Sequence, residues 1–127
     1  MKRGFTLLEL VIVIIVIGIL VAMALPQFTR MAERGRVAEA KAGLDMIRKA
    51  EGIWYAENSA YTADMTTTGL GKDIPEISTL PVTEWTYLVV TGLNTFTATA
   101  TRVRGENAAA TITIDNTGVV GGTHPLR

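Results

Sequence analysis

Residues 4–28 read GFTLLELVIVIIVIGILVAMALPQF, and this stretch decides how the chain is organised. From Phe5 to Leu25 nearly every residue is apolar. As an α-helix this segment would be about 31 Å long at ~1.5 Å per residue, close to the ~30 Å hydrocarbon core of a bilayer. The sequence therefore predicts a membrane-spanning helix near the N-terminus.

Glu9 is the unusual residue of this segment. A carboxylate at the edge of an apolar span is costly and by default marks a function. In a simple anchor, the helix macrodipole would stabilise an acid in the first turn. Cleavage between Gly4 and Phe5 would instead create a cationic amine about one helical turn from Glu9. In a bundle of such helices, Glu9 of one copy would then neutralise the amine of another in the apolar interior, where an unpaired charge costs several kcal/mol.

A secretory signal peptide is the alternative interpretation of the same segment. The apolar core of a signal peptide usually has about 7–15 residues and precedes a small-residue cleavage site. Ala22 and Ala24 would place that cleavage near Leu25. The length of the apolar run and the presence of Glu9 favour the membrane helix.

The stretch from Gly4 to Glu9 resembles the class III signal of type IV pilins and type II secretion pseudopilins. This resemblance implies that a prepilin peptidase removes the basic leader after Gly4, that Phe5 is N-methylated, and that Glu9 guides assembly. Gly18 and Pro26 fall where the family weakens its helix. The resemblance covers about the first quarter of the chain.

The resemblance also implies partners and a location. The precursor would lie in the inner membrane with its leader in the cytoplasm, and the pilus or secretion assembly machinery would build it into a homo-oligomeric helical filament. That filament would be a cell-surface pilus or a periplasmic pseudopilus. Charge alone does not orient the span, because Lys2 and Arg3 precede it while Arg30, Arg34 and Arg36 follow it.

Beyond Pro26 the sequence resumes a helical pattern. Apolar residues recur at spacings of three and four, which is typical of an amphipathic helix packed on one side. They are Val37, Ala40, Leu44, Ile47 and Trp54. Glu51 interrupts this stripe, and we expect the helix to end near residues 55–58.

The last third alternates like β-strands. Phe96, Ala98 and Ala100 alternate with threonines, and turn residues 92–94 and 115–118 separate the apolar runs. We expect an α+β fold, with the long N-terminal helix packed on an antiparallel sheet of three or four strands, as in the pilin αβ-roll. The expected segments are a leader (1–4), a transmembrane and assembly helix (5–27), an amphipathic helix (28–58), a variable surface loop (59–84), and a sheet with a C-terminal tail (85–127).

Catalytic chemistry has little support. The chain has no cysteine and one histidine, His124, which we expect to be solvated near the C-terminus. Asp115 and Asn116 favour a turn over a calcium site, which needs six to eight oxygens. The segment 69–72 is too short for a phosphate loop. Twelve basic and twelve acidic side chains provide no general attraction for nucleic acid, so we expect no enzyme, cofactor, metal or nucleic-acid site.

The leading hypothesis is therefore a structural subunit of a type IV pilus-like filament. The alternative within the family is a major pseudopilin of a type II secretion system. The lack of cysteine, and so of a C-terminal disulfide, resembles both pseudopilins and shorter pilins. The lack of a convincing calcium cluster favours the pilin. Hypotheses from other classes are a membrane-tethered binding module, which would not be cleaved after Gly4, and an exported enzyme with a cleaved signal.

Overall fold

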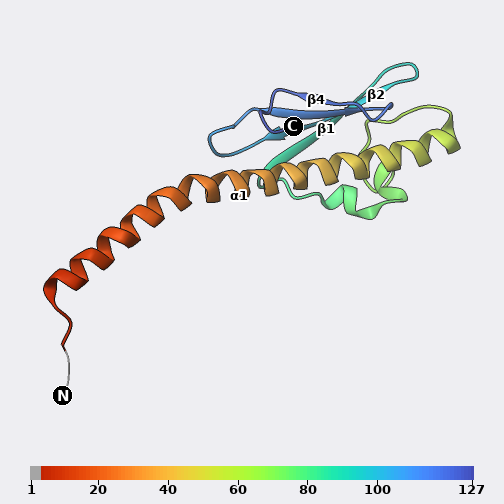
Figure 1. Ribbon diagram of the computed structural model, residues 1–127. Helices are drawn as coiled ribbons and strands as arrows, with labels where there is room; N and C mark the ends of the chain where they lie inside the picture. Colours follow the sequence, from red (N-terminus) through yellow and green to blue (C-terminus); the bar gives the residue numbers. More distant parts are fainter. Residues whose placement is uncertain (1–3) are drawn as a thin grey trace. The chain divides into compact units, whose positions relative to one another are not determined.

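The computed structural model describes residues 4–127, and the expectations for Lys2, Arg3 and the rest of segment 1–3 lie outside this range. Its first element is the 52-residue helix α1, Leu7–Asn58, which continues through Gly18 and Pro26 without interruption. Figure 1 shows α1 as the element that begins the described chain and also underlies the strands. The helix ends where the sequence predicts.

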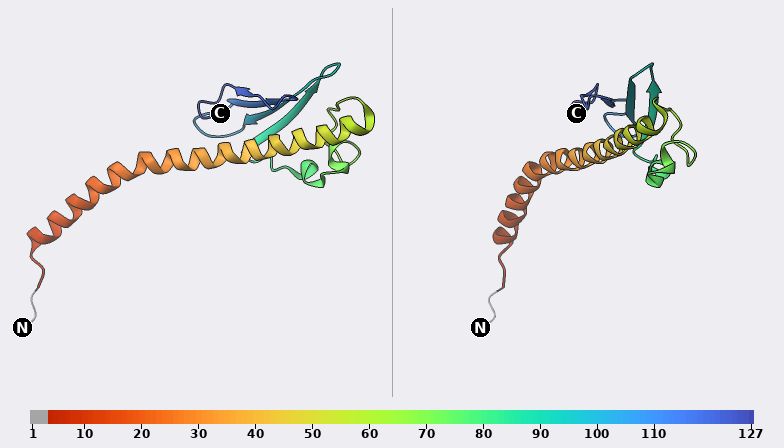
Figure 2. Two further views of the ribbon diagram at one scale, coloured as in Figure 1. Left: turned by 45° about the vertical axis from the view of Figure 1, so that its right-hand side comes forward. Right: turned by 90° about the vertical axis from the view of Figure 1, so that its right-hand side faces the viewer.

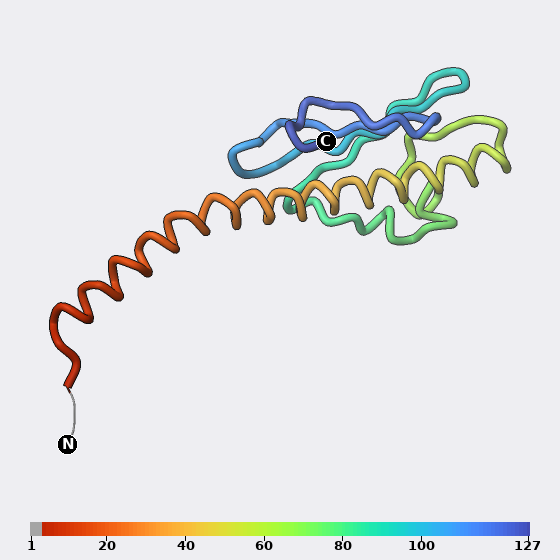
Figure 3. The backbone as a smooth tube through the Cα atoms, in the orientation of Figure 1, coloured from red at the N-terminus to blue at the C-terminus, as the bar shows by residue number. Residues whose placement is uncertain are grey.

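Four antiparallel strands form one sheet in the order β1-β2-β3-β4. Their bounds are β1 Trp85–Thr91, β2 Phe96–Arg102, β3 Thr111–Asp115 and β4 Val120–Gly122. The connections between β1 and β2 and between β2 and β3 leave opposite ends of the sheet (Figure 3). The expected α+β fold, a long helix packed on an antiparallel sheet, is confirmed.

The alternation within the strands is also confirmed. In β2, Phe96, Ala98 and Ala100 are buried, whereas the threonines between them are partly or fully exposed. Register pairs Ala98 with Val89 of β1 and with Ile114 of β3, so buried residues of three strands lie side by side on one face. That face packs on the C-terminal half of α1 through Val37, Ala40, Leu44, Ile47 and Ala50.

Residues 59–84 connect the helix to the sheet and contain two short 3₁₀ helices. These are η1, Leu70–Lys72, and η2, Pro75–Thr79. Leu70 and Ile77 are buried in the same core as the sheet residues, so this connection is packed rather than freely solvated. The turned views of Figure 2 show that this segment and the sheet lie against different sides of the C-terminal half of α1.

The chain divides into two compact units. The first extends to Gly35 and comprises the apolar part of α1 with the residues that follow Pro26. The second runs from Arg36 to Arg127 and contains the rest of α1, the 3₁₀ helices and the sheet. We call these the helical unit and the head.

Candidate functional site

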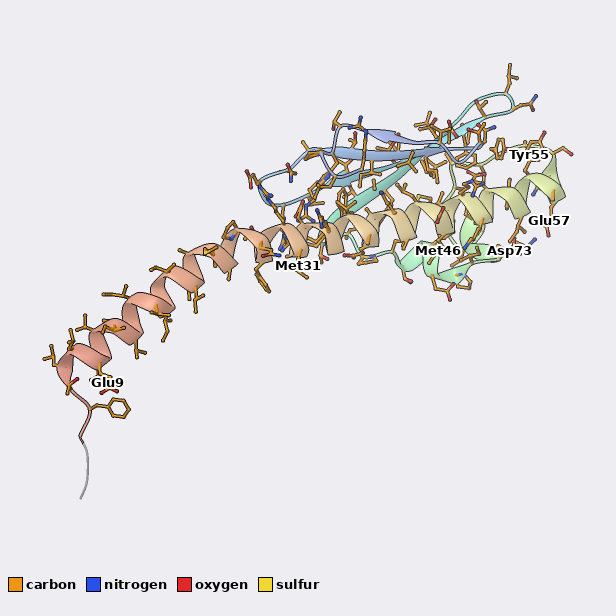
Figure 4. All side chains as sticks on the ribbon, in the orientation of Figure 1. Glu9, Met31, Met46, Tyr55, Glu57 and Asp73 are labelled. Carbon is orange, nitrogen blue, oxygen red and sulfur yellow. The ribbon has the colours of Figure 1, made fainter. Side chains whose placement is uncertain are left out.

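The apolar surface of the helical unit is the main candidate site. Side chains from Phe5 to Met31 are exposed on every side of the helix, including Leu10 at 56% and Ile14 at 65% (Figure 4). Among residues 4–127, α1 is the helix that is long and apolar enough to cross a membrane, judged by length and composition. Burying one such Leu, Ile or Val side chain contributes about 1.5–3 kcal/mol, so this surface favours a bilayer or a neighbouring helix over water.

Glu9 lies in the first turn of this exposed helix (Figure 4). Its backbone N–H donates to the hydroxyl Oγ1 of Thr6 at 3.2 Å and to the carbonyl O of Thr6 at 3.1 Å. Thr6 therefore caps the helix, and the sequence Thr6-Leu-Leu-Glu9 has the spacing of a capping box. The Glu9 side chain is exposed, which leaves its carboxylate available to a partner.

Gly18 and Pro26, which the sequence analysis singled out, both lie inside the regular helix. A methyl group added at Gly18 would meet nothing within 4 Å, so packing within one chain does not require a glycine there. Pro26 lacks the amide that would continue the hydrogen-bond ladder. Its carbonyl accepts a bond of 3.0 Å from the hydroxyl of Thr29. Both residues weaken the helix intrinsically without ending it.

The head holds a buried carboxylate that the sequence analysis treated only as an interruption of the apolar stripe. Glu51 is fully buried, and its Oε2 accepts a bond of 3.1 Å from the backbone N–H of Thr62. Within the described residues its Oε1 has no hydrogen-bond partner. Burial raises the pKa of Glu51 from the ordinary 4.5 to about 7, and the bond from Thr62 opposes part of that rise.

His124 was expected to be solvated, and this expectation is wrong. The residue is fully buried, with its ring centroid 5.7 Å from that of Trp85. The ring Nδ1 of His124 accepts a bond from the backbone N–H of Leu126. The backbone N–H of His124 donates to the carbonyl of Thr111. The β3–β4 hairpin turns the chain back, so the last residues pack over Trp85. The position of His124 near the C-terminus does not indicate this contact.

Trp85 joins the sheet to the helix. Its indole N–H donates to the carbonyl of Arg36 at 3.0 Å. The guanidinium of Arg102 lies 5.2 Å from the centre of the Trp85 ring, and its Nη1 is 2.6 Å from Oε2 of Glu84. This cluster of aromatic and charged groups is structural, since each member binds another part of the head.

The other candidates from the sequence also have local structural roles. Oδ1 of Asp115 accepts bonds from the amide and hydroxyl of Thr117 and from the amide of Val119, and these bonds hold the pKa of Asp115 below its usual range. The segment 69–72 forms η1, where Lys72 pairs with Glu57 at 3.1 Å. Among residues 4–127, no three or more histidine or acidic side chains gather as a metal site would require.

Known proteins that are similar to this chain share its N-terminal apolar segment. The family described as "Prokaryotic N-terminal methylation motif" matches residues 1–25. The type IV major pilin protein PilA of Myxococcus xanthus is 42% identical over 61 residues, which are 48% of this chain and 28% of that protein. The fimbrial protein EcpC of Eikenella corrodens is 34% identical over 115 residues, which are 85% of this chain and 72% of that protein.

The chain belongs to the type IV pilin family. The pseudopilin branch of this family is represented by the type II secretion system core protein G of Pseudomonas aeruginosa, which is 34% identical over 60 residues, 47% of this chain and 42% of that protein. Apart from EcpC, the relatives named here are matched over less than half of their own length. No solved structure matches the chain.

Sequence reasoning found the long apolar helix but missed three positions in this pilin head. Gly43 is buried beneath Tyr87, where a Cβ would lie 2.7 Å from the tyrosine hydroxyl oxygen. Gly43 falls on the stripe that begins at Val37, so the helical spacing itself was a signal that it is buried. Glu51 falls on the same stripe, but the spacing does not show whether a charged residue there is an exposed break or a buried group. No comparable signal pointed to His124.

Proposed function

We propose that this chain is a structural subunit of a type IV pilus-like filament, cleaved between Gly4 and Phe5 and methylated at Phe5. The exposed apolar surface of α1 carries the proposal, because it needs a bilayer before assembly and neighbouring helices afterwards. The match of residues 1–25 to the methylation motif supports the position of the cleavage.

Glu9 is the proposed guide of assembly. It is the single acid between Phe5 and Arg30, and cleavage would place a new amine four residues before it. In a staggered bundle, the carboxylate of one subunit would neutralise the amine of the next. The pairing removes two buried unpaired charges together, so it selects one axial offset between neighbouring helices. Gly18 and Pro26 would let the helix adapt locally within that bundle, since both lower its intrinsic stability.

The proposed segments divide the work of the filament. Residues 1–4 are the leader that prepilin peptidase removes, residues 5–27 span the membrane and build the filament core, and residues 28–58 carry the head. The loop of residues 59–84 and the sheet of residues 85–127 form the outer surface of the filament. The unassembled subunit would lie in the inner membrane, and the assembly machinery would extract it.

A pseudopilus of a type II secretion system is the second candidate. The similarity to core protein G supports it. The similarity to the major pilin PilA and to EcpC, which matches 85% of this chain, favours the pilus. Shearing intact cells separates the two, since surface pili are released and a periplasmic pseudopilus is not.

Mass spectrometry of the native protein tests the proposal. A chain that begins at N-methylated Phe5 and is recovered from filaments supports it. A chain that begins near Leu25 would identify an exported protein with a cleaved signal peptide. An intact chain from Met1, monomeric in detergent, would identify a membrane-tethered module. Either of the last two results overturns the filament proposal.

A further inference from the structure

Two arginines stand on one side of α1 just beyond the apolar span. Arg30 and Arg34 are four residues apart, so their side chains leave the helix on the same side, one turn from each other. Both are exposed and line a shallow groove of about 610 Å³ that lies within the helical unit. The rest of the groove is formed by Met23, Pro26, Gln27 and Met31.

Their distance from the span places these arginines at the level of lipid headgroups. Arg30 comes five residues after Leu25, the last residue of the apolar run, which is about 7.5 Å along a helix. The headgroup region adds roughly 5–7 Å to each side of the hydrocarbon core. Helical side chains lean toward the helix N-terminus, so the guanidinium of Arg34, one turn further out, is directed back toward the same layer.

The charge at this end of the span is positive. Residues 26–38 contain Arg30, Arg34 and Arg36 but one acid, Glu33. If the head is exported, the positive-inside rule gives no reason for basic residues on this side of the membrane. Met23, which lies in the same groove and inside the apolar run, is 72% exposed and offers a surface for an acyl chain.

We propose that Arg30 and Arg34 bind the phosphate of an anionic phospholipid in the outer leaflet of the inner membrane. The planar guanidinium groups donate in bidentate fashion to phosphate oxygens, and two of them one turn apart bracket a single headgroup. Met23, inside the apolar run, contacts the upper part of the acyl chain. The proposal rests on insertion of the unassembled subunit into the membrane and requires neither cleavage after Gly4 nor polymerisation.

The test measures lipid retention by the intact chain. The protein is reconstituted in an equimolar mixture of phosphatidylglycerol and phosphatidylcholine, extracted into detergent, and analysed by native mass spectrometry. We expect preferential retention of phosphatidylglycerol. The double variant Arg30→Gln/Arg34→Gln should lose about fivefold of this preference per arginine and roughly thirtyfold in total, taking about 1 kcal/mol for each basic residue at a membrane surface.

Two further double variants separate a binding site from a general charge effect. Lys49→Gln/Arg104→Gln removes the same charge from exposed positions of the head and should leave retention unchanged. Arg30→Lys/Arg34→Lys keeps the charge but loses the bidentate geometry, so it should retain less phosphatidylglycerol than the unmodified chain.

Four results would overturn the proposal. They are equal retention of the two lipids, an equal loss in the head variant, full retention in the lysine variant, and displacement of the lipid by soluble inorganic phosphate. If Arg30→Gln/Arg34→Gln impairs filaments and leaves lipid retention intact, the arginines serve contacts between subunits instead. Because lipid retention is measured on unassembled chains, it tests the proposal even if the chain forms no filament.

Discussion

The backbone amide of Thr62 donates a 3.1 Å hydrogen bond to the fully buried carboxylate of Glu51. This bond joins the end of α1 to the connection that follows it, across eleven residues of sequence. An acid with one unpartnered oxygen in a packed interior is costly when charged, and burial accordingly raises its pKa to about 7. The head therefore contains a proton-sensitive link in the physiological range of pH.

The stability of the head should fall as pH rises from about 4.5 to 7. In this window folded Glu51 keeps a proton that the unfolded chain has released, so the free energy of unfolding decreases with pH and levels off above 7. The full effect is about 3 kcal/mol, taking ~1.4 kcal/mol for each tenfold change in proton affinity. Glu51→Gln preserves an acceptor for Thr62 and removes the charge. It should raise the melting temperature at pH 8 and have a smaller effect at pH 5.

Glu57→Gln is the matched control for this experiment. Glu57 lies on the same helix but is exposed and paired with Lys72. Exposed pairs contribute at most about 1 kcal/mol, so this variant should change the melting temperature little at either pH. Thermal unfolding of the full chain in detergent, followed by circular dichroism, provides the measurement. The prediction would be contradicted if the melting temperatures of Glu51→Gln and the wild type differed by the same amount at every pH.

Trp85→Phe should weaken the attachment of the sheet to the helix. The substitution keeps an aromatic ring in the core but removes the N–H that donates to the carbonyl of Arg36 at 3.0 Å. Losing this hydrogen bond between sheet and helix, together with buried ring area, should lower the free energy of unfolding by about 1–3 kcal/mol. Denaturant titration measures the change. Trp54→Phe, at a partly buried position of α1, controls for loss of an indole and should cost less.

The sequence could predict those features that depend on one segment of the chain. Periodicities of two and near 3.6 located the strands and the helix, because burial of one face imposes a spacing on Ala98 and Leu44 that can be read directly. The apolar run likewise indicated the exposed apolar part of α1 from one segment alone. These features concern one element and its solvent.

Features that require two distant segments could not be predicted. The fate of His124 depends on the β3–β4 hairpin bringing it over Trp85, thirty-nine positions earlier in the sequence. The burial of Glu51 depends on residues 59–84 folding back over α1, and their composition indicated only a loop. A lone polar residue within an apolar stripe has two outcomes, an exposed break or a buried group, and the packing of other segments decides between them.

Alanine substitutions at two glycines of α1 should change the free energy of unfolding in opposite directions. A Cβ at Gly43 would lie 2.7 Å from the hydroxyl oxygen of Tyr87, whereas one at Gly52 would meet nothing within 4 Å. Gly43→Ala should therefore destabilise the head, because overpacking costs about 1–3 kcal/mol and outweighs a gain in helix propensity of up to about 1 kcal/mol. Gly52→Ala should stabilise it by up to about 1 kcal/mol, the difference in helix propensity. Chemical unfolding of both variants under one condition checks the pair, and a shared sign would refute the packing argument.

Glu9→Leu should leave the precursor in the membrane and reduce filament yield at least tenfold. The leucine strengthens the apolar span, but the new amine of a neighbouring subunit then lacks its counter-charge in the filament interior, and a loss of ~1.4 kcal/mol already lowers an association constant tenfold. Membrane fractionation followed by quantification of sheared filaments provides both readouts. Because the Glu9 carboxylate also stands in the first turn of α1, at the acidic position of a capping box, the helix cap needs a separate control.

Thr6→Ala supplies that control, since it removes the capping hydroxyl and leaves the carboxylate in place. The lost cap should cost about 0.5–2 kcal/mol of local helix stability, and the capping interaction lies at the very end of α1. If charge pairing drives assembly, Thr6→Ala should form filaments in far greater yield than Glu9→Leu. Equal losses in the two variants would assign Glu9 a role in starting its own helix. Normal filaments from Glu9→Leu would rule out both roles, and the axial offset between subunits would then have to come from packing of the apolar helices alone.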